Sequence, residues 1–180
     1  MKRNLLISVV VVVAVFATWT IVRRFIPSYI EYRGQRIKLT KYYLSYEDYK
    51  DDPENIHPSE IARVQRLVVE APIASSFSSR KEMVDAAFSI HFPGYGVGGL
   101  SDGTKDGENS LIGVSIEIPS VDKNRYFAFR HANGKYVLID SFVESNIPPI
   151  MRVKQDGNQL VYSTYEGTVR VIRPMSPQTN

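Results

Sequence analysis

The sequence predicts an α+β protein with a single transmembrane helix at its N-terminus, followed by a domain of two helices packed on a curved antiparallel sheet. Three observations predict this fold class. An uncharged apolar segment begins the chain, two segments with helical apolar periodicity follow, and the C-terminal part alternates apolar and polar residues between turn-forming dipeptides. Helices first and antiparallel strands afterwards are an order typical of α+β domains.

Residues 4–22, NLLISVVVVVAVFATWTIV, carry no charge and lie between Lys2 and Arg3 on one side and Arg23 and Arg24 on the other. As a helix this segment reaches about 28 Å, close to the hydrocarbon core of a bilayer at about 30 Å. We therefore expect residues 1–24 to form a membrane anchor or uncleaved signal. Residues 25–57 are then a linker, and residues 58–180 form the α+β domain.

Two alternatives to an anchor stay open for this segment, namely a cleaved signal peptide and an unusual buried helix. Val15 and Ala17 occupy the positions that precede a signal-peptidase cut. The apolar run nevertheless continues past Ala17 through Trp19 and Ile21 to the arginine pair. That profile favours an anchor that ends at a membrane interface.

The net charge of the chain comes from the anchor. The whole chain is formally +3, with 22 basic and 19 acidic residues, and residues 1–24 hold four basic residues and no acidic one, so the remainder is formally −1. This argues against nucleic-acid binding, which needs a concentrated positive surface. The chain has no cysteine, which excludes disulfides and thiolate metal sites.

Two features of the sequence indicate opposite orientations of the anchor in the membrane. A short basic tail before the apolar run resembles an export signal, which places the C-terminal domain outside the cytoplasm. The positive-inside rule favours the opposite orientation, because six basic residues follow within about 20 positions of the span: Arg23, Arg24, Arg33, Arg36, Lys38 and Lys41. We favour export and a single-pass protein of the cytoplasmic membrane.

The linker contains two features. The sequence YIEYRGQRIKLT predicts a small hairpin around a turn at Gly34 and Gln35. Beyond it, Tyr42, Tyr46 and Tyr49 recur on one face of a helical turn, with carboxylates on the other faces. These tyrosines are candidate ligand-binding residues, an aromatic platform for a sugar, a cation or a partner. The alternative, which we favour, is an amphipathic segment that packs its tyrosines on the domain.

Two helices are expected next. Pro58 suits a first helical turn and Pro72 ends the run, with a single apolar stripe between them: Ile61, Val64, Leu67 and Val68. Ser79 and Glu82 have the spacing of a capping box and begin a second helix, whose buried side comprises Met83, Val84, Ala87 and Phe88.

The glycine-rich stretch 93–110 contains G-x-G-x-x-G at Gly94, Gly96 and Gly99. A dinucleotide site needs a helix to begin at the third glycine, but LSDGTKDGENS is rich in helix breakers. We expect a long surface loop, with two alternatives: a ligand lid, or a cation site of carbonyl and carboxylate oxygens. Its candidate metal ligands are Asp102, Asp106 and Glu108.

The C-terminal half predicts strands. SLIGVSIEIP alternates as a half-buried strand, and RYFAFRHANGKYVLIDSF forms two strands around Asn133 and Gly134. A two-residue turn there pairs Phe129 with Leu138 and Phe127 with Asp140. The two remaining turns are expected at Asp156-Gly157 and Glu166-Gly167. They collect one apolar face of Met151, Val153, Leu160, Tyr162, Val169 and Val171, opposite a face of Arg152, Lys154, Ser163 and Arg170.

This order of elements and the NGKY hairpin resemble the layout of cystatin-like and nuclear transport factor-like domains. In those domains helices fill a cone-shaped sheet and sometimes leave a pocket. The resemblance concerns element order alone, and such folds include both enzymes and inert modules.

Titratable residues give no catalytic constellation. On the expected pairing His131 and Asp140 share a face but lie about 13 Å apart, too far for a hydrogen bond. His57 precedes Pro58, and His91 lies at the start of the glycine-rich stretch. Asp140, on an apolar face, is either an acid or base in a pocket or, as we favour, a solvated residue at a strand end.

The sequence therefore favours a membrane-tethered, non-enzymatic binding or assembly module with no cofactor. Its expected partners are the membrane, through residues 4–22, and a protein. The alternative is a small-ligand-binding protein or enzyme with a pocket under the sheet, gated by loop 93–110 and using Asp140 or His91. A third hypothesis is a lipid-facing module that uses Arg152 and Arg170.

Overall fold

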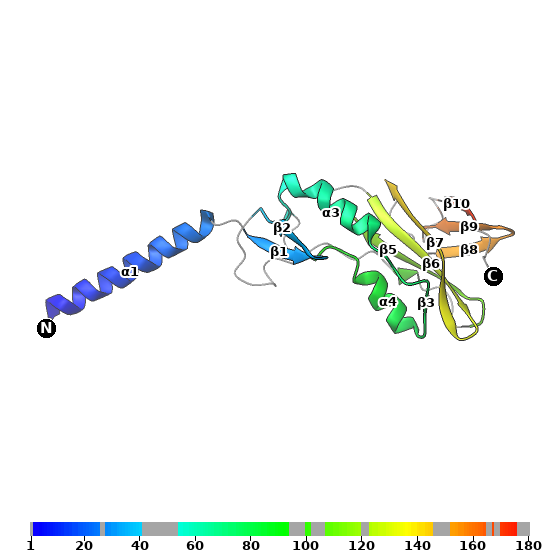
Figure 1. Ribbon diagram of the computed structural model, residues 1–180, viewed down its shortest axis with the longest axis horizontal. Helices are drawn as coiled ribbons and strands as arrows, with labels where there is room; N and C mark the ends of the chain where they lie inside the picture. Colours follow the sequence, from blue (N-terminus) through cyan, green and yellow to red (C-terminus); the bar gives the residue numbers. More distant parts are fainter. Residues whose placement is uncertain are drawn as a thin grey trace. The chain divides into compact units, whose positions relative to one another are not determined.

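The computed structural model describes residues 2–25, 28–40, 54–93, 100–101, 107–119, 123–145, 152–164, 167 and 170–175. It is an α+β structure of helices and antiparallel sheets (Figure 1). The chain forms two compact units, residues 1–61 and residues 62–180. The helices and antiparallel sheets confirm the α+β class expected from the sequence.

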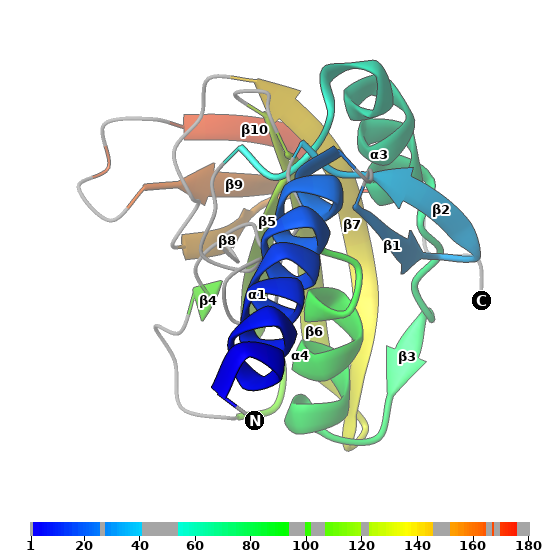
Figure 2. The same ribbon diagram turned by 90° about the vertical axis from the view of Figure 1, so that its left-hand side faces the viewer.

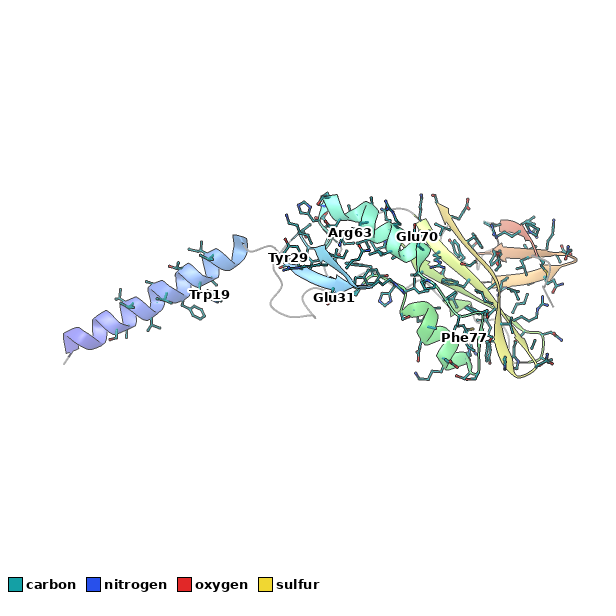
Figure 3. All side chains as sticks on the ribbon, in the orientation of Figure 1. Trp19, Tyr29, Glu31, Arg63, Glu70 and Phe77 are labelled. Carbon is teal, nitrogen blue, oxygen red and sulfur yellow. The ribbon has the colours of Figure 1, made fainter. Side chains whose placement is uncertain are left out.

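The first unit begins with helix α1, Lys2–Phe25. Its large apolar side chains between Val9 and Val22 are exposed, including that of Trp19, which projects from the helix in Figure 3. Among the residues that the structure describes, no helix combines the length and the apolar character that a membrane crossing needs. Of the expected fold, the α+β part is confirmed and the transmembrane helix is not.

The hairpin of the first unit consists of β1, Tyr29–Tyr32, and β2, Gln35–Lys38. Its turn is formed by Arg33 and Gly34, whose φ angles of 49° and 72° define the left-handed pair of a type I′ turn. The expected turn at Gly34-Gln35 was wrong by one residue, because the alternation alone does not locate the two left-handed positions.

The second unit contains a five-stranded antiparallel sheet in the order β3-β7-β6-β5-β4 (Figure 2). Its strands are β3 Ser76–Phe77, β4 Leu100–Ser101, β5 Leu111–Glu117, β6 Lys123–Ala132 and β7 Lys135–Ser145. The β6–β7 hairpin provides its two longest strands, and β6 lies at the centre. The hairpin expected around Asn133 and Gly134 is confirmed.

Both expected helices are present. Helix α3 spans Pro58–Glu70, and α4 spans Arg80–Phe88 with Ser79 as its N-cap. The Ser79 Oγ accepts a hydrogen bond of 3.2 Å from the Glu82 N–H, as a capping box requires. The Glu82 carboxylate accepts from the hydroxyl and N–H of Ser78, and these bonds lower its pKa.

Helices α3 and α4 lie on one side of the five-stranded sheet in both views (Figures 1 and 2). On this side Phe129 packs edge-on against Phe77. The buried Arg125 donates through Nη1 to the carbonyls of Val68 and Ala71, at 2.8 and 2.7 Å. A cation there satisfies the last carbonyls of α3 and complements the negative end of the helix dipole.

A second, three-stranded antiparallel sheet lies on the opposite side, formed by β8 Arg152–Asp156, β9 Gln159–Ser163 and β10 Arg170–Pro174. The core between the sheets contains Tyr126, Ala128, Phe142, Val153, Leu160 and Tyr162. Two sheets therefore replace the single curved sheet that we expected. Because both faces of β5 are covered, Ser115 is fully buried and the expected half-buried strand was wrong.

The registers of the C-terminal hairpins match the expected faces. Tyr162 pairs with Val171 in β9–β10, as predicted. The β8–β9 turn lies one residue later than expected, at Gly157 and Asn158, so that Val153 pairs with Tyr162. Each β8–β9 pairing is therefore shifted by two positions. Because the faces of a strand repeat every second residue, every side chain stays on the face that was expected. Met151 and Val169, also assigned to this face, lie outside the described residues.

The β6–β7 turn is formed by Asn133 and Gly134, as the sequence predicted, with φ angles of 52° and 70°. Gly134→Ala is expected to lower the free energy of unfolding by about 1 kcal/mol, because the left-handed conformation strains any residue with a Cβ. Steric clash adds nothing, since no atom lies within 4 Å of the added Cβ. Urea unfolding in detergent checks this, with Gly134→Asn as the milder control. Equal stability of all three proteins would contradict it.

Candidate functional site

A β-bulge determines where Asp140 lies. Phe129 pairs with Leu138 as expected, but Ala128 pairs with Asp140, so that Ile139 is an extra residue in β7. Phe127 consequently pairs with Ser141. The expected pairing of Phe127 with Asp140 was wrong, because an inserted residue reverses the face of every residue beyond it.

The bulge directs Asp140 into the space between the two sheets, on the face of Tyr126 and Phe142. Its Oδ2 accepts hydrogen bonds from the Tyr162 hydroxyl and from Nε of Arg173, both at 2.7 Å. Its Oδ1 accepts from Nη2 of Arg173 at 3.2 Å. We call these three residues, Asp140, Tyr162 and Arg173, the Asp140 clamp.

The clamp is an ion pair with a buried carboxylate and a partly exposed guanidinium. The Asp140 side chain is 9% exposed and that of Arg173 is 36% exposed, so Asp140 does not lie at a solvated strand end as we had favoured. The Arg173 guanidinium also lies over the Phe142 ring, 4.4 Å from its centroid. Both carboxylate oxygens accept hydrogen bonds. Because Asp140 lies in β7, Tyr162 in β9 and Arg173 in β10, the clamp joins these three strands.

The pKa shifts of Tyr162 and Arg173 agree with their hydrogen bonds to Asp140. Burial first, and then the hydrogen bond and the negative charge of Asp140, raise the pKa of the Tyr162 phenol above its ordinary value. The hydrogen bond to Asp140 raises the pKa of Arg173 as well. The phenol therefore stays protonated and serves as a donor.

The raised pKa of Tyr162 predicts alkaline destabilisation. An unfolded tyrosine ionises near pH 10, whereas the folded Tyr162 stays neutral, so its contribution is complete below pH 10 and is lost as pH rises. We expect Tyr162→Phe to destabilise by about 1 kcal/mol at pH 8, through the lost hydrogen bond. The difference in the free energy of unfolding between the unsubstituted protein and Tyr162→Phe should shrink by about 1 kcal/mol between pH 10 and 11. Urea unfolding at each pH checks this, and a constant difference would contradict it.

The histidine candidates lie on other elements. His91 follows α4, and its Nδ1 donates to the carbonyl oxygen of Phe88. The rings of His131 and Tyr136 are in contact, tilted by 31° with their centroids 4.7 Å apart. The bulge places Asp140 and His131 on opposite faces of the sheet, which corrects the expectation that they share one.

The C-terminal end of the glycine-rich stretch is bound to the β6–β7 hairpin. Glu108 Oε1 accepts from the N–H of Asn133 at 2.9 Å, and His131 Nδ1 lies 3.2 Å from the carbonyl oxygen of Gly107. Backbone bonds join Asn109 and Ser110 to His131. Glu108 therefore has a structural partner at the base of the loop.

The remaining candidates lie mostly outside the described residues, including the metal ligands Asp102 and Asp106 and the tyrosines Tyr42, Tyr46 and Tyr49. Within the described ranges, no group of three or more metal-ligating side chains gathers. Directly after Gly99 the chain forms strand β4, paired with Gly113 and Val114, in place of the helix that a dinucleotide site needs.

Arg173 and Tyr162 were not expected from the sequence as partners of Asp140. A signal was present, because strand alternation places Arg173 on the same face as Val171, the apolar face expected from the sequence. A cation on an apolar face indicates a carboxylate partner, since buried charges are paired. We had considered only the histidines as partners.

Comparison with known proteins finds no match: no family model, no curated protein and no solved structure is similar to this chain. Three hydrogen bonds hold the Asp140 clamp together, and it presents neither a nucleophile nor an available base.

Proposed function

We propose that the protein is a membrane-tethered, non-enzymatic binding or assembly module whose C-terminal domain lies outside the cytoplasm. The observation that carries this proposal is the apolar surface of α1. Five consecutive residues, Val9 to Val13, are each between 54% and 65% exposed. Successive residues of a helix point about 100° apart, so five of them sample every side. A helix that is apolar all round is typical of a membrane span.

The length and charge pattern of α1 support an anchor. Side chains are described from Ser8 to Val22, and the uncharged run of the sequence extends beyond them to Asn4. The whole helix has 24 residues and is about 36 Å long, which exceeds a hydrocarbon core of about 30 Å. Lys2 and Arg24 are then near the two interfaces.

The polar side chains of α1 are satisfied within the helix. The Thr18 hydroxyl donates to the Ala14 carbonyl at 2.8 Å, and the Thr20 hydroxyl donates to the Phe16 carbonyl. Internal bonding of this kind suits lipid, where water is not present to bond a hydroxyl.

The Asp140 clamp supports a non-enzymatic role. An acid or base needs an oxygen within reach of a substrate, but both oxygens of Asp140 bind Arg173, and one also binds Tyr162. The alternative, a ligand-binding protein or enzyme gated by residues 93–110, loses one of its two proposed polar groups. His91 remains its other candidate.

Export is supported by the layout of the N-terminus, a short basic tail followed directly by a long apolar run. The test of tethering is alkaline carbonate extraction of membranes, combined with the intact mass of the extracted chain. We expect the full-length mass in the membrane pellet. A mass that corresponds to a chain beginning after Ala17, in the soluble fraction, would overturn the anchor in favour of a cleaved signal.

A further inference from the structure

We propose that the outer face of the β1–β2 hairpin binds the anionic headgroups of membrane lipids. The inference rests on the proposed anchor and extends it, because it assigns a second, electrostatic membrane contact to the chain. The hairpin would then fix the distance and the orientation in which the linker leaves the bilayer.

The hairpin has two chemically different faces. The register pairs Tyr29 with Lys38 and Glu31 with Arg36, so these four side chains share one face. The opposite face includes Tyr32 and Ile37, which are buried. We call the face that carries Tyr29, Glu31, Arg36 and Lys38 the outer face. Lys38 is half-buried and the other three side chains are exposed, as can be followed for Tyr29 and Glu31 in Figure 3.

The outer face combines a cation and an aromatic ring. The Arg36 guanidinium lies 4.1 Å from the centroid of the Tyr29 ring, which is 42% exposed. Tyrosine is enriched where a membrane meets water, because its ring is amphipathic. Arg33, exposed at the tip, is directed to the other face, because its Nε donates to the Tyr32 hydroxyl at 3.4 Å. The cations of the outer face are therefore Arg36 and Lys38.

Chain connectivity keeps this face near the bilayer. Helix α1 ends at Phe25 and β1 begins at Tyr29. Four Cα steps reach at most about 14 Å, so with Phe25 at the interface the hairpin starts in or next to the headgroup layer. Residues 23–38 contain five basic residues and one acidic residue. A basic segment is attracted to an anionic surface where it lies within a Debye length of it, about 8 Å, and the reach of this linker allows that approach.

The other basic surface is the solvent face of the three-stranded sheet, where Arg152 and Arg170 are both paired with Ser163. Its cations come from positions about 130 and more residues beyond the anchor along the chain, so connectivity does not hold them at the membrane. Neutralising Arg152 and Arg170 is therefore a control with the same change of charge.

The experiment uses the full-length protein in lipid nanodiscs, either purely zwitterionic or containing about one third of an anionic phosphatidylglycerol. Because the chain has no cysteine, a fluorophore can be attached to Glu31→Cys alone and quenched by a headgroup-linked quencher. Arg36→Gln with Lys38→Gln removes the two cations of the outer face. Neither position lies in the turn, so the left-handed pair Arg33 and Gly34 is kept.

We expect strong quenching of the position-31 label in anionic discs and little in zwitterionic discs. Each cation near an anionic surface is worth about fivefold in binding, so the double neutralisation should weaken contact by about 25-fold, as should about 1 M salt. Arg152→Gln with Arg170→Gln should leave quenching unchanged. Equal quenching in both lipids, or loss only with the Arg152 and Arg170 pair, would overturn the proposal.

A second label keeps the anchor and the hairpin separable. A fluorophore on Val12→Cys should be quenched by an acyl-chain quencher in both lipids. If that label is not quenched, the anchor itself is wrong. If it is quenched while the position-31 label shows no contact with anionic headgroups, the anchor stands and the hairpin proposal fails.

Discussion

Replacing Val12 and Val13 by arginine should release the protein from the membrane fraction. The two residues lie at the middle of the uncharged run 4–22. An arginine at the centre of a membrane helix costs about 2.5–3.5 kcal/mol on an insertion scale, so two together oppose insertion by about 6 kcal/mol. Alkaline extraction should move the double variant from the pellet to the supernatant.

The matched control is Val12→Leu with Val13→Leu, which keeps the segment apolar and should stay in the pellet. Far-UV circular dichroism of both variants shows whether the C-terminal domain still folds. Retention of the arginine variant in the pellet, with a folded domain, would mean that residues 4–22 do not span the bilayer.

The second large effect is expected at the Asp140 clamp. Asp140→Ala leaves the Tyr162 hydroxyl and the Arg173 guanidinium without their acceptor. Removing one partner of a buried ion pair costs about 3–5 kcal/mol. Arg173 can turn toward water because it is 36% exposed, so we expect the lower end, about 3 kcal/mol. The melting temperature should fall by roughly 10 °C.

A double-mutant cycle separates the clamp from simple loss of packing. Arg173→Ala alone leaves the Asp140 charge poorly compensated between the sheets and should also destabilise strongly. The combined Asp140→Ala and Arg173→Ala variant should lose less than the sum of the two, by at least about 1 kcal/mol. Strict additivity would contradict a direct interaction.

The sequence was sufficient for the two helices and the hairpins of the domain, because their signals are local, but not for the division of the strands into two sheets. Pro58 and Ser79 mark helix starts, and Asn133-Gly134 marks a hairpin. The apolar face of β8 to β10 was correct although the β8–β9 turn lies one residue later than expected. That shift moves pairings by two positions, and the faces of a strand repeat every second residue.

The position of Asp140 was not predictable by the same reasoning. Ile139 is a bulge residue in a run, YVLIDSF, that is compatible with a regular strand. The bulge becomes favourable only through tertiary structure, because it directs the Asp140 carboxylate to Tyr162 and Arg173, which lie 22 and 33 residues further along the chain. Such a long-range gain leaves no local pattern in the sequence.

The most direct test of a tethered domain outside the cytoplasm is chemical labelling of Lys154→Cys in intact cells with a membrane-impermeant maleimide. Position 154 is exposed in β8, and the chain has no other cysteine. Our account predicts labelled, full-length protein in the membrane pellet after alkaline extraction. Protein in that pellet that is labelled only after the cells are lysed would contradict export, and labelled protein in the soluble fraction would contradict the tether.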